Sequence, residues 1–477
     1  MIKQLLSAYS LKYPQIVIYM LQRNEYDIKP FLKWYFKVED FNKISVRGSL
    51  VQTLKSKLLL GTLNCLILAN VLYAIYLLSR TFVASNPIYG LFGIIGLVLY
   101  PLICAMLILL PLIAARIFIV NPHQRMLIKR SKAIFKNSKA LKIAVAGSYG
   151  KTTMKELLAT VLSEAGEVAV TPGNKNVAAS HAVFAAKLTG KEKYIIVEFG
   201  EGKPKDVVGF TKTISPDIGV ITGIAPAHLD KYPNIDAIAK DIFYLAKFVK
   251  HQNSYVNGES EYVDKYLDSK DQIYSRNGIA HWKVSKIING WQGISFELSN
   301  DKEKITVKSQ LLGRHQIGPL SAVAVIARSN GLSTGQIELG LSKTRAFEHR
   351  MELKVVGGAY VIDDSYNGNL EGIRAGLSLL SELGAKRKIY VTPGLVDQGK
   401  ETKNIHYRIG QMILDTNPEK VVLIKNSVTN YILAGLDGYK GDLVIESNPL
   451  KFYLNLDKIL AQGDLLMMQN DWPDNYK

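Results

Sequence analysis

The segment GSYGKTT, which runs from Gly147 to Thr153, has the residue types and spacing of a phosphate-binding loop. It lies between an apolar run, KIAVA, that predicts a strand and a stretch from Met154 to Ala165 that predicts an amphipathic helix. Glycines let backbone N–H groups surround a phosphate, a lysine reaches the terminal phosphates, and a threonine hydroxyl can ligate Mg2+ at a helix N-terminus. The segment therefore predicts ATP and Mg2+ as ligands.

The loop departs from the commonest form of this motif, in which a glycine stands five residues before Gly150, where this chain has Val145. An ordinary turn between a strand and a helix is the alternative interpretation. If the loop binds a nucleotide, the residues that contact it are Gly147, Ser148, Gly150, Lys151, Thr152 and Thr153.

Two more polar residues follow predicted strands of the same region. Glu198 lies near the end of the run YIIVEFG, and His228 comes shortly after the run DIGVITG. The carboxyl ends of parallel strands meet at one edge of a sheet, so these side chains are expected near the phosphate loop. Thr152 and Glu198 would then ligate one Mg2+, and His228 would hold a second cation. The alternatives are an exposed strand end for Glu198 and an ordinary loop residue for His228.

Strand-like runs alternate with helical patterns from residue 141 to residue 343, which predicts a mostly parallel sheet covered by helices on both faces. A second alternating unit, residues 344–477, resembles a smaller Rossmann-type domain. It lacks the Gly-x-Gly-x-x-Gly pattern, so a nicotinamide cofactor is not indicated. The expected fold class is α/β, with a phosphate-loop central domain and a smaller Rossmann-like C-terminal domain, preceded by a transmembrane helical hairpin.

The hairpin is predicted by two long apolar stretches. Residues 58–79 contain no charged residue, and neither do the 35 residues between Arg80 and Arg116. Roughly 20 apolar residues span a bilayer core, so the first stretch can cross a membrane once and the second can return as a tilted or kinked helix. A buried helical hairpin in a soluble protein is the alternative.

Positive charge is concentrated around these stretches. The net charge is +18, and residues 1–142 hold 19 Lys or Arg against 4 Asp or Glu. Both flanks of the hairpin are strongly basic, which places them on the cytoplasmic side by the positive-inside rule. The later part has no basic stripe interleaved with aromatic residues, so no nucleic acid partner is expected. The only cysteines, Cys65 and Cys104, lie in the apolar stretches and predict neither a disulfide framework nor a zinc site.

The expected organisation has five parts. Residues 1–57 mix aromatic and basic residues, a composition suited to a cytosolic segment at a lipid interface, although packing against the soluble domains is an equally good explanation. The other parts are the transmembrane hairpin 58–115, a basic linker 116–140, an ATP-binding central domain 141–343 and a C-terminal domain 344–477. The lipid bilayer is an expected partner, and the protein is expected to be a monomer.

Seven motifs occur in the order found in the Mur ligases, and residues 141–477 resemble that family. The similarity is greatest to the members that add D-alanyl-D-alanine to a muramyl tripeptide. It implies peptidoglycan precursor synthesis at the bacterial cytoplasmic membrane, with the catalytic domains on the cytoplasmic side. The motifs are GSYGKTT, TPGNKN (171–176), VEFG (197–200), PDIGVITGIAPAHLDKY (216–232), LLGRHQ (311–316), HRME (349–352) and DDSYNGN (363–369).

The resemblance implies an ATP-dependent ligase that joins a carboxylate to an amine. ATP would phosphorylate the carboxylate of a muramyl peptide linked to a nucleotide or a lipid, and an amine would attack the acyl phosphate to form an amide. By position in the motifs, the catalytic residues would be Lys151, Glu198, His228 and Arg350. Asn257, Arg350 and Asp364 would complete the nucleotide site, and Asn174, Asn176, Asn367 and Asn369 would contact the substrates.

Three features depart from the family pattern. The lysine that related ligases carbamylate to bridge two metals is expected at Ile242, and the nearest lysine is Lys240. After TPGN, the family's Asn-Asn-x-x-Gly-x-Pro is replaced by Lys175, Asn176 and VAAS. The membrane hairpin with its basic flanks stands in place of the N-terminal domain that binds the uridine nucleotide.

Three functions therefore compete. The first is a membrane-anchored ligase of cell-wall precursor assembly, which the ordered motifs favour. The second is a membrane-bound ligase that builds an amide-linked surface polymer such as polyglutamate, prompted by the missing uridine-binding domain. The third is a nucleotide-binding membrane scaffold without activity, prompted by Ile242 at the carbamate position.

Overall fold

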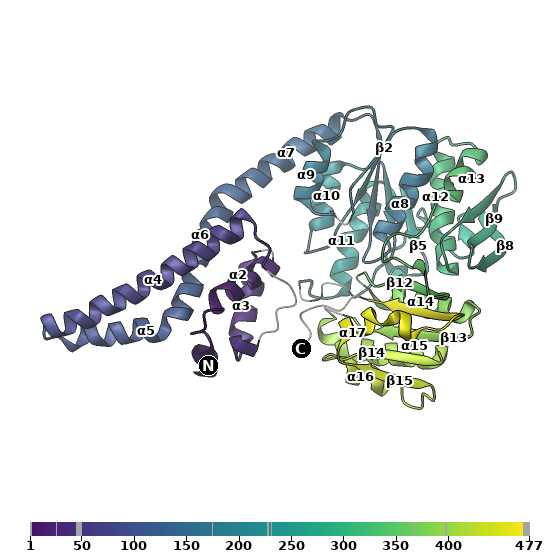
Figure 1. Cartoon of the computed structure of the whole chain (residues 1–477). Helices are drawn as coiled ribbons and strands as arrows, with labels where there is room; N and C mark the ends of the chain where they lie inside the picture. Colours follow the sequence, from purple (N-terminus) through teal and green to yellow (C-terminus); the bar gives the residue numbers. More distant parts are fainter. Residues whose placement is uncertain are drawn as a thin grey trace. The chain divides into compact units, whose positions relative to one another are not determined.

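The structure is a computed structural model that describes residues 2–24, 26–43, 50–173, 175–226, 229, 231–366, 368–395 and 398–470. It forms two compact units, Met1–Met126 and Leu127–Lys477, which are described separately (Figure 1). The division falls inside the predicted basic linker. Three predicted site residues, Asn174, His228 and Asn367, lie outside the described residues.

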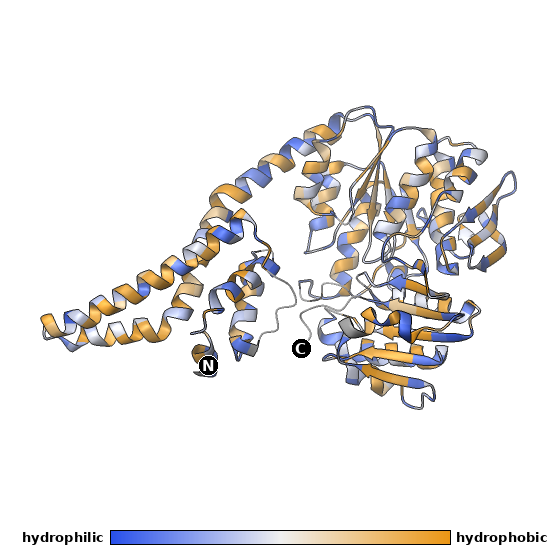
Figure 2. Ribbon diagram, in the orientation of Figure 1, coloured by the Kyte–Doolittle hydropathy of each residue, from blue (hydrophilic) through white to orange (hydrophobic). Residues whose placement is uncertain are grey.

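The first unit is helical. Three helices, α1 (Ile2–Ser7), α2 (Tyr13–Arg23) and α3 (Ile28–Lys37), precede α4 (Leu54–Val83) and α5 (Pro87–Leu107). A short helix α6 (Leu109–Ala115), a π-helical turn at Arg116–Val120 and α7 (Asn121–Asn137) follow. By length and composition alone, α4 and the helical stretch Pro87–Asn137 could each cross a membrane. Helices α4 and α5 carry apolar residues around most of their circumference (Figure 2). Helix α7, which ends in the second unit, is more polar and contains several lysines and arginines.

The helical hairpin depends on small residues and on a proline. At Gly93, an added Cβ would lie 2.8 Å from the side chain of Leu78 on α4, so the two helices approach closely. Pro101 interrupts α5 and has no N–H to donate to the carbonyl of Leu97. The hydroxyl of Tyr9 donates to this carbonyl at 2.9 Å. An N-terminal side chain therefore satisfies the carbonyl that the proline leaves without its helical partner.

The second unit contains a ten-stranded sheet with the order β10-β9-β8-β7-β6-β5-β4-β1-β3-β2. Its strands from β2 to β6 pair in parallel, and β7 to β10 extend it with antiparallel pairs that the sequence pattern did not predict. The strands are β1 (Leu141–Ala146), β2 (Val168–Val170), β3 (Tyr194–Glu198), β4 (Ile218–Ile221), β5 (Ser254–Asn257), β6 (Gln272–Ser275), β7 (Gly278–Ile279), β8 (Trp282–Gly290), β9 (Gly293–Ser299) and β10 (Lys304–Ser309).

Helices cover both faces of this sheet, because successive residues of β1 enter opposite cores. Ile143 and Val145 pack with helices α8, α12 and α13, whereas Ala144 and Ala146 pack with α9, α10, α11 and the end of α7. The α/β prediction is confirmed. The helices are α8 (Lys151–Leu162), α9 (Ala178–Ala185), α10 (Asp206–Ile214), α11 (Ile235–Phe248), α12 (Ile317–Ser329) and α13 (Thr334–Ser342).

A smaller, six-stranded sheet follows, with the order β11-β12-β16-β13-β14-β15. Only β11 runs antiparallel to its neighbour. Its strands are β11 (Glu352–Val356), β12 (Ala359–Asp364), β13 (Arg387–Thr392), β14 (Lys420–Ile424), β15 (Asp442–Glu446) and β16 (Asp464–Gln469). Its helices are α14 (Leu370–Glu382), α15 (Thr402–Thr416), α16 (Thr429–Gly435), α17 (Pro449–Leu454) and α18 (Leu456–Ile459).

Candidate active site

The loop between β1 and α8 has the backbone shape of a phosphate-binding loop. Gly147 and Gly150 have φ values of 144° and 72°, and a Cβ added to Gly147 would lie 2.3 Å from the hydroxyl of Thr222. The N–H of Ser148 donates to the carbonyl of Gly223 at 2.8 Å. Glycine is therefore needed at Gly147 both for its backbone angles and for the close approach of the segment after β4. Helix α8 begins at Lys151, three residues earlier than predicted.

Lys151 is held by internal acceptors. Its Nζ lies 2.9 Å from Glu201 Oε2 and 3.2 Å from Glu201 Oε1, and it donates to the carbonyl of Gly147. Glu201 follows the end of β3 and is buried. Sequence reasoning assigned no role to Glu201; its position three residues after Glu198 was the available signal. A phosphate that recruits Lys151 has to compete with this carboxylate.

Glu198 is fixed at the end of β3 by contacts at both its backbone and its carboxylate. The hydroxyl of Thr152 donates to Oε2 at 3.1 Å, and the amide of Asn176 donates to Oε1 at 3.1 Å. The backbone N–H of Glu198 donates to Thr171 Oγ1 at 3.0 Å, and its carbonyl lies 2.8 Å from His181 Nε2. The structure therefore brings together Thr152, Glu198 and Asn176, which the sequence had assigned to metal and substrate.

The donor set around Glu198 suits Mg2+. Thr152 and Glu198 offer oxygen atoms at the N-terminus of α8, next to the phosphate loop, and a hard cation prefers such ligands. Because the hydroxyl and the carboxylate already touch, both can turn to one ion without a change in the backbone. A bound Mg2+ would neutralise phosphate charge at this position.

Asn257 lies on the other side of the loop. Its amide donates to the carbonyl of Thr222 at 3.0 Å, which holds the side chain beside the segment that packs on the phosphate loop. Tyr149 packs on Gly223 in the same place, where an added Cβ would lie 2.3 Å from the tyrosine ring. Burial raises the pKa of Tyr149 to about 12, so this residue stays neutral and acts through its shape and hydroxyl.

The C-terminal domain contributes Arg350, two residues before β11, and Asp364, the last residue of β12. The guanidinium of Arg350 lies over the ring of Tyr366, 4.4 Å from its centroid. Burial lowers the pKa of Arg350, while Asp364, Tyr366 and Glu198 favour its charged form. Burial raises the pKa of Asp364 to about 6, opposed by a hydrogen bond from Gln469 at 2.9 Å and by the charge of Arg350. Arg350 therefore remains positively charged, and the negative charge of Glu198 helps to stabilise that charge.

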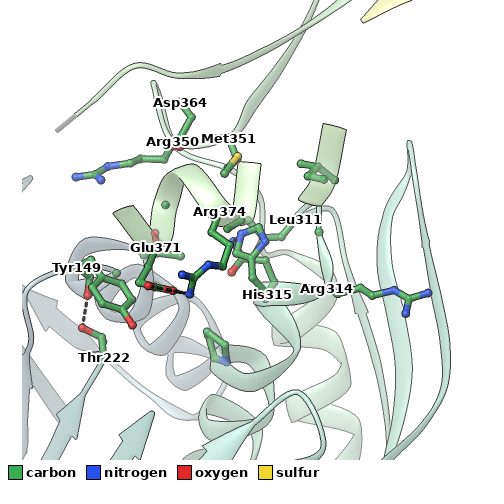
Figure 3. A pocket seen from close by; sticks show the side chains of 18 of the residues that line it. Tyr149, Thr222, Leu311, Arg314, His315, Arg350, Met351, Asp364, Glu371 and Arg374 are labelled. Atoms are coloured by element: carbon green, nitrogen blue, oxygen red, sulfur yellow. Dashed lines mark hydrogen bonds and ion pairs between the residues drawn. The ribbon is translucent and has the colours of Figure 1, made fainter. Parts of the chain in front are cut away.

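A cavity of about 380 Å³ lies between the domains that contain the two sheets (Figure 3). Lys151, Thr152 and Glu198 are not among its lining residues. Among the predicted nucleotide and substrate residues, those in its lining are Gly150, Thr153, Asn257, Arg350, Asp364 and Asn369. Asn369 also accepts a hydrogen bond from Gly372 N at 2.9 Å as the N-cap of α14. A volume of this size is typical of small-ligand sites.

The cavity also contains residues that sequence reasoning left without a role. His315 belongs to the LLGRHQ motif and lines the cavity, where burial and the nearby Arg276 lower its pKa to about 4. Arg374 and Glu371 form an ion pair at 2.9 Å on α14 (Figure 3). Both residues lie far from the phosphate loop in the sequence, and only the fold brings α14 to this site. Their place in the site could therefore not be predicted from the sequence.

Helix α11 does not bring a lysine to Glu198. Ile242, at the expected carbamate position, is buried in the core, and Lys240 is 71% exposed and pairs with Asp236 at 3.1 Å. The register of the helix therefore turns Lys240 to solvent. In the described structure neither residue contacts the Glu198 carboxylate.

A second group of potential ligands lies at the start of the C-terminal domain. Ligand atoms of His349, Glu352 and Asp363 lie within 4.8 Å of one another. The ammonium of Lys354, however, contacts Glu352 at 3.0 Å and Asp363 at 2.8 Å. His349 Nδ1 itself lies 2.8 Å from Asp363 Oδ2, so all three side chains already have partners within the group or in Lys354, and the group carries no metal assignment.

Similar sequences and folds occur among known ligases. Residues 145–327 match the family described as the Mur ligase middle domain. Among curated proteins, similar chains are the UDP-N-acetylmuramoyl-tripeptide–D-alanyl-D-alanine ligases of Buchnera aphidicola (27% identical, covering 62% of this chain and 66% of that one), Haemophilus influenzae (26%, 57% and 61%) and Escherichia coli (25%, 59% and 64%). The alignments thus span 61% to 66% of the length of these relatives.

Solved structures share the fold. MurF from Acinetobacter baumannii aligns with a TM-score of 0.65 at 19% identity, covering 73% of this chain and 77% of that one. MurF from Thermotoga maritima in complex with ADP aligns with a TM-score of 0.63 at 19% identity, covering 73% and 80%. Residues 145–327 thus resemble the Mur ligase middle domain, and the similar sequences and folds include those of MurF-type ligases.

Proposed function

We propose that this protein is an ATP-dependent ligase that joins a carboxylate to an amine in peptidoglycan precursor synthesis. The observation that carries the proposal is a phosphate-type loop whose helix holds the Thr152–Glu198 pair and whose residues Gly150 and Thr153 line, with Arg350, one cavity between two α/β domains. These are the parts needed to bind a triphosphate and to neutralise charge during phosphoryl transfer.

The reaction has two steps. A carboxylate oxygen of the first substrate attacks the terminal phosphorus of ATP, and the bond to the bridging oxygen breaks to release ADP. The amine of the second substrate then attacks the carbonyl of the acyl phosphate, loses a proton and expels phosphate, which leaves an amide. Phosphorylation is needed because the charge on a carboxylate resists nucleophilic attack.

Each predicted residue has a place in this scheme. Lys151 would leave Glu201 to contact the transferred phosphate, and Thr152 with Glu198 would hold Mg2+. Arg350 and Asp364 would complete the nucleotide site from the C-terminal domain, with Asn257 across the cavity. Asn176, which contacts Glu198, would face the carboxylate substrate, and Asn369 the amine. His228, Asn174 and Asn367 retain the roles that the family resemblance implies.

The relatives named above add D-alanyl-D-alanine to a UDP-N-acetylmuramoyl tripeptide, and a similar pair of substrates is proposed for this protein. The hairpin α4–α5 would anchor the protein in the cytoplasmic membrane as a monomer, with residues 127–477 on the cytoplasmic side. The carrier of the muramyl peptide would be either the nucleotide or a membrane lipid.

The helical first unit favours one competing function. The chain has two long apolar helices before the family-matched residues, a feature suited to a ligase that builds an amide-linked surface polymer such as polyglutamate. Detergent-solubilised protein with ATP, Mg2+ and either carrier of the muramyl tripeptide should release phosphate on addition of D-alanyl-D-alanine. Phosphate release that is driven by glutamate but not by D-alanyl-D-alanine would favour the polymer. If neither amine drives phosphate release, the ligase proposal is refuted.

A further inference from the structure

Lys155 is the one lysine or arginine among the described residues that is fully buried. It lies on α8, one helical turn after Lys151, and neither the loop motif nor the proposed chemistry uses it. Its Nζ donates to the carbonyl of Thr171 at 2.9 Å and to the carbonyl of Gly173 at 2.6 Å. It also lies 3.4 Å from Glu198 Oε2 and 3.2 Å from Glu156 Oε1.

These contacts use all the hydrogens of an ammonium group. Two go to backbone carbonyls and the third faces the carboxylates, so Lys155 is a fixed cation without a free N–H. Burying a charge is costly unless every hydrogen-bonding group is satisfied and an opposite charge is near. A methionine would fill the same space without that cost, so packing alone does not explain a lysine here.

The partners of Lys155 belong to three different segments. The first is α8 itself, through the adjacent Glu156, the second is the Thr171–Gly173 segment after β2, and the third is the end of β3 with Glu198. Thr171 also accepts from the backbone of Glu198, and Asn176 donates to the Glu198 carboxylate. The loop after β2 therefore touches the proposed metal ligand at several points, and Lys155 lies at their centre.

Without the ammonium, the three groups would repel one another. The carbonyls of Thr171 and Gly173 and the carboxylate of Glu198 are all acceptors, and all point at Nζ. Removing the cation would leave three acceptors facing one another, those of Thr171 and Glu198 in buried residues, and the loop would move away from Glu198 to regain solvent. The loop carries the TPGNKN motif, whose asparagines are the proposed contacts of the carboxylate substrate.

We propose that Lys155 is a positioning residue that holds the loop after β2 against Glu198, so that the carboxylate substrate meets the phosphate site in a fixed geometry. This inference rests on the proposed ligase function. Lys155 would affect the affinity for the carboxylate substrate, whereas Lys151 would contact the nucleotide.

The test compares Lys155→Met with the wild type in the full-length protein. The KM for the carboxylate substrate should rise about tenfold or more, while the KM for ATP changes less than about threefold. The half-saturating Mg2+ concentration should not rise in the variant, because the substitution removes a positive charge that repels cations at Glu198. Lys142→Met is the control: its ammonium pairs with Asp217 at 3.3 Å at the start of β1, and its kinetics should match the wild type. An unchanged KM for the carboxylate substrate would overturn the inference. So would the same fold-change in the KM for the carboxylate substrate and the KM for ATP.

Hydrogen exchange gives a readout that needs no activity. Peptides that cover residues 168–177 should exchange faster in Lys155→Met, while those that cover residues 147–152 keep their rates. If residues 168–177 exchange at the same rate in Lys155→Met and in the wild type, the inference is overturned, whether or not the wild type has ligase activity. If these residues exchange faster in the variant but the wild type releases no phosphate in the assay, only the proposed function is refuted. If Lys155→Met does not fold, Lys155→Gln, which keeps N–H donors but no charge, should show the same pattern to a smaller degree.

Discussion

Lys151 and Glu201 form an enclosed ion pair, with Nζ 2.9 Å from Oε2 and side chains that are 12% and 3% exposed. The residue expected to bind phosphate is thus bound to an internal carboxylate. An incoming triphosphate must take over this lysine, and the lost ion pair subtracts from the affinity for the nucleotide.

The first prediction follows from this competition. Glu201→Gln should bind a fluorescent, non-hydrolysable ATP analogue several-fold more tightly than the wild type, because the amide holds Lys151 less strongly. Titration of the full-length protein measures this change. Glu164→Gln serves as the control and should have no effect. Glu164 lies in the turn after the C-terminal end of α8, far along the chain from Lys151, and pairs with Lys343. Weaker or equal binding by Glu201→Gln would show that the carboxylate does not compete with phosphate.

The second prediction concerns the metal. Thr152→Ala removes the hydroxyl that contacts Glu198 and should raise the half-saturating Mg2+ concentration roughly tenfold, whereas Thr152→Ser keeps the oxygen and should stay near the wild type. A Mg2+ titration of phosphate release at saturating ATP measures both variants. Equal Mg2+ curves for the alanine and serine variants would argue against Thr152 as a ligand.

The third prediction is a dependence of stability on pH. Burial raises the pKa of Asp364 from 3.8 to about 6, so between these values the folded protein holds a proton that the unfolded chain has released. The group therefore stabilises the fold below about pH 4, and this contribution is lost as the pH rises through about 6. Asp364→Asn should gain melting temperature relative to the wild type between pH 4 and pH 7. A difference between the two melting curves that does not change with pH would contradict the raised pKa.

Much of the phosphate site could be predicted from the sequence because its signals are local. The glycines of the loop, Lys151 and Thr152 lie within seven residues, and Glu198 ends an apolar strand. Lys155 and Glu201 could not be predicted, because a lysine inside a helix and a glutamate after a strand are ordinary surface residues until the fold buries them. Strands β7 and β8 were missed because β7 has two residues and β8 is largely exposed, which leaves little apolar pattern. Strands β9 and β10 do bury every second residue, so their alternation was available in the sequence and was overlooked.

The fourth prediction concerns the membrane unit. All described residues of the cavity belong to Leu127–Lys477. A fragment of residues 127–477 should therefore bind the ATP analogue with the affinity of the full-length protein, within about threefold, and should no longer sediment with membranes. Loss of nucleotide binding in a fragment that still melts cooperatively would mean that the helical unit helps to form the site.

The most direct measurement of the central claim follows oxygen from the carboxylate. A substrate labelled with 18O in the reacting carboxyl group should give released phosphate that carries one 18O atom per turnover, because that oxygen forms the bond to phosphorus and leaves with it. Lys151→Ala should lower the rate of this release by roughly 10²–10³-fold. Phosphate without label from the wild type would mean that water accepts the phosphoryl group, and the protein would be an ATPase rather than a ligase.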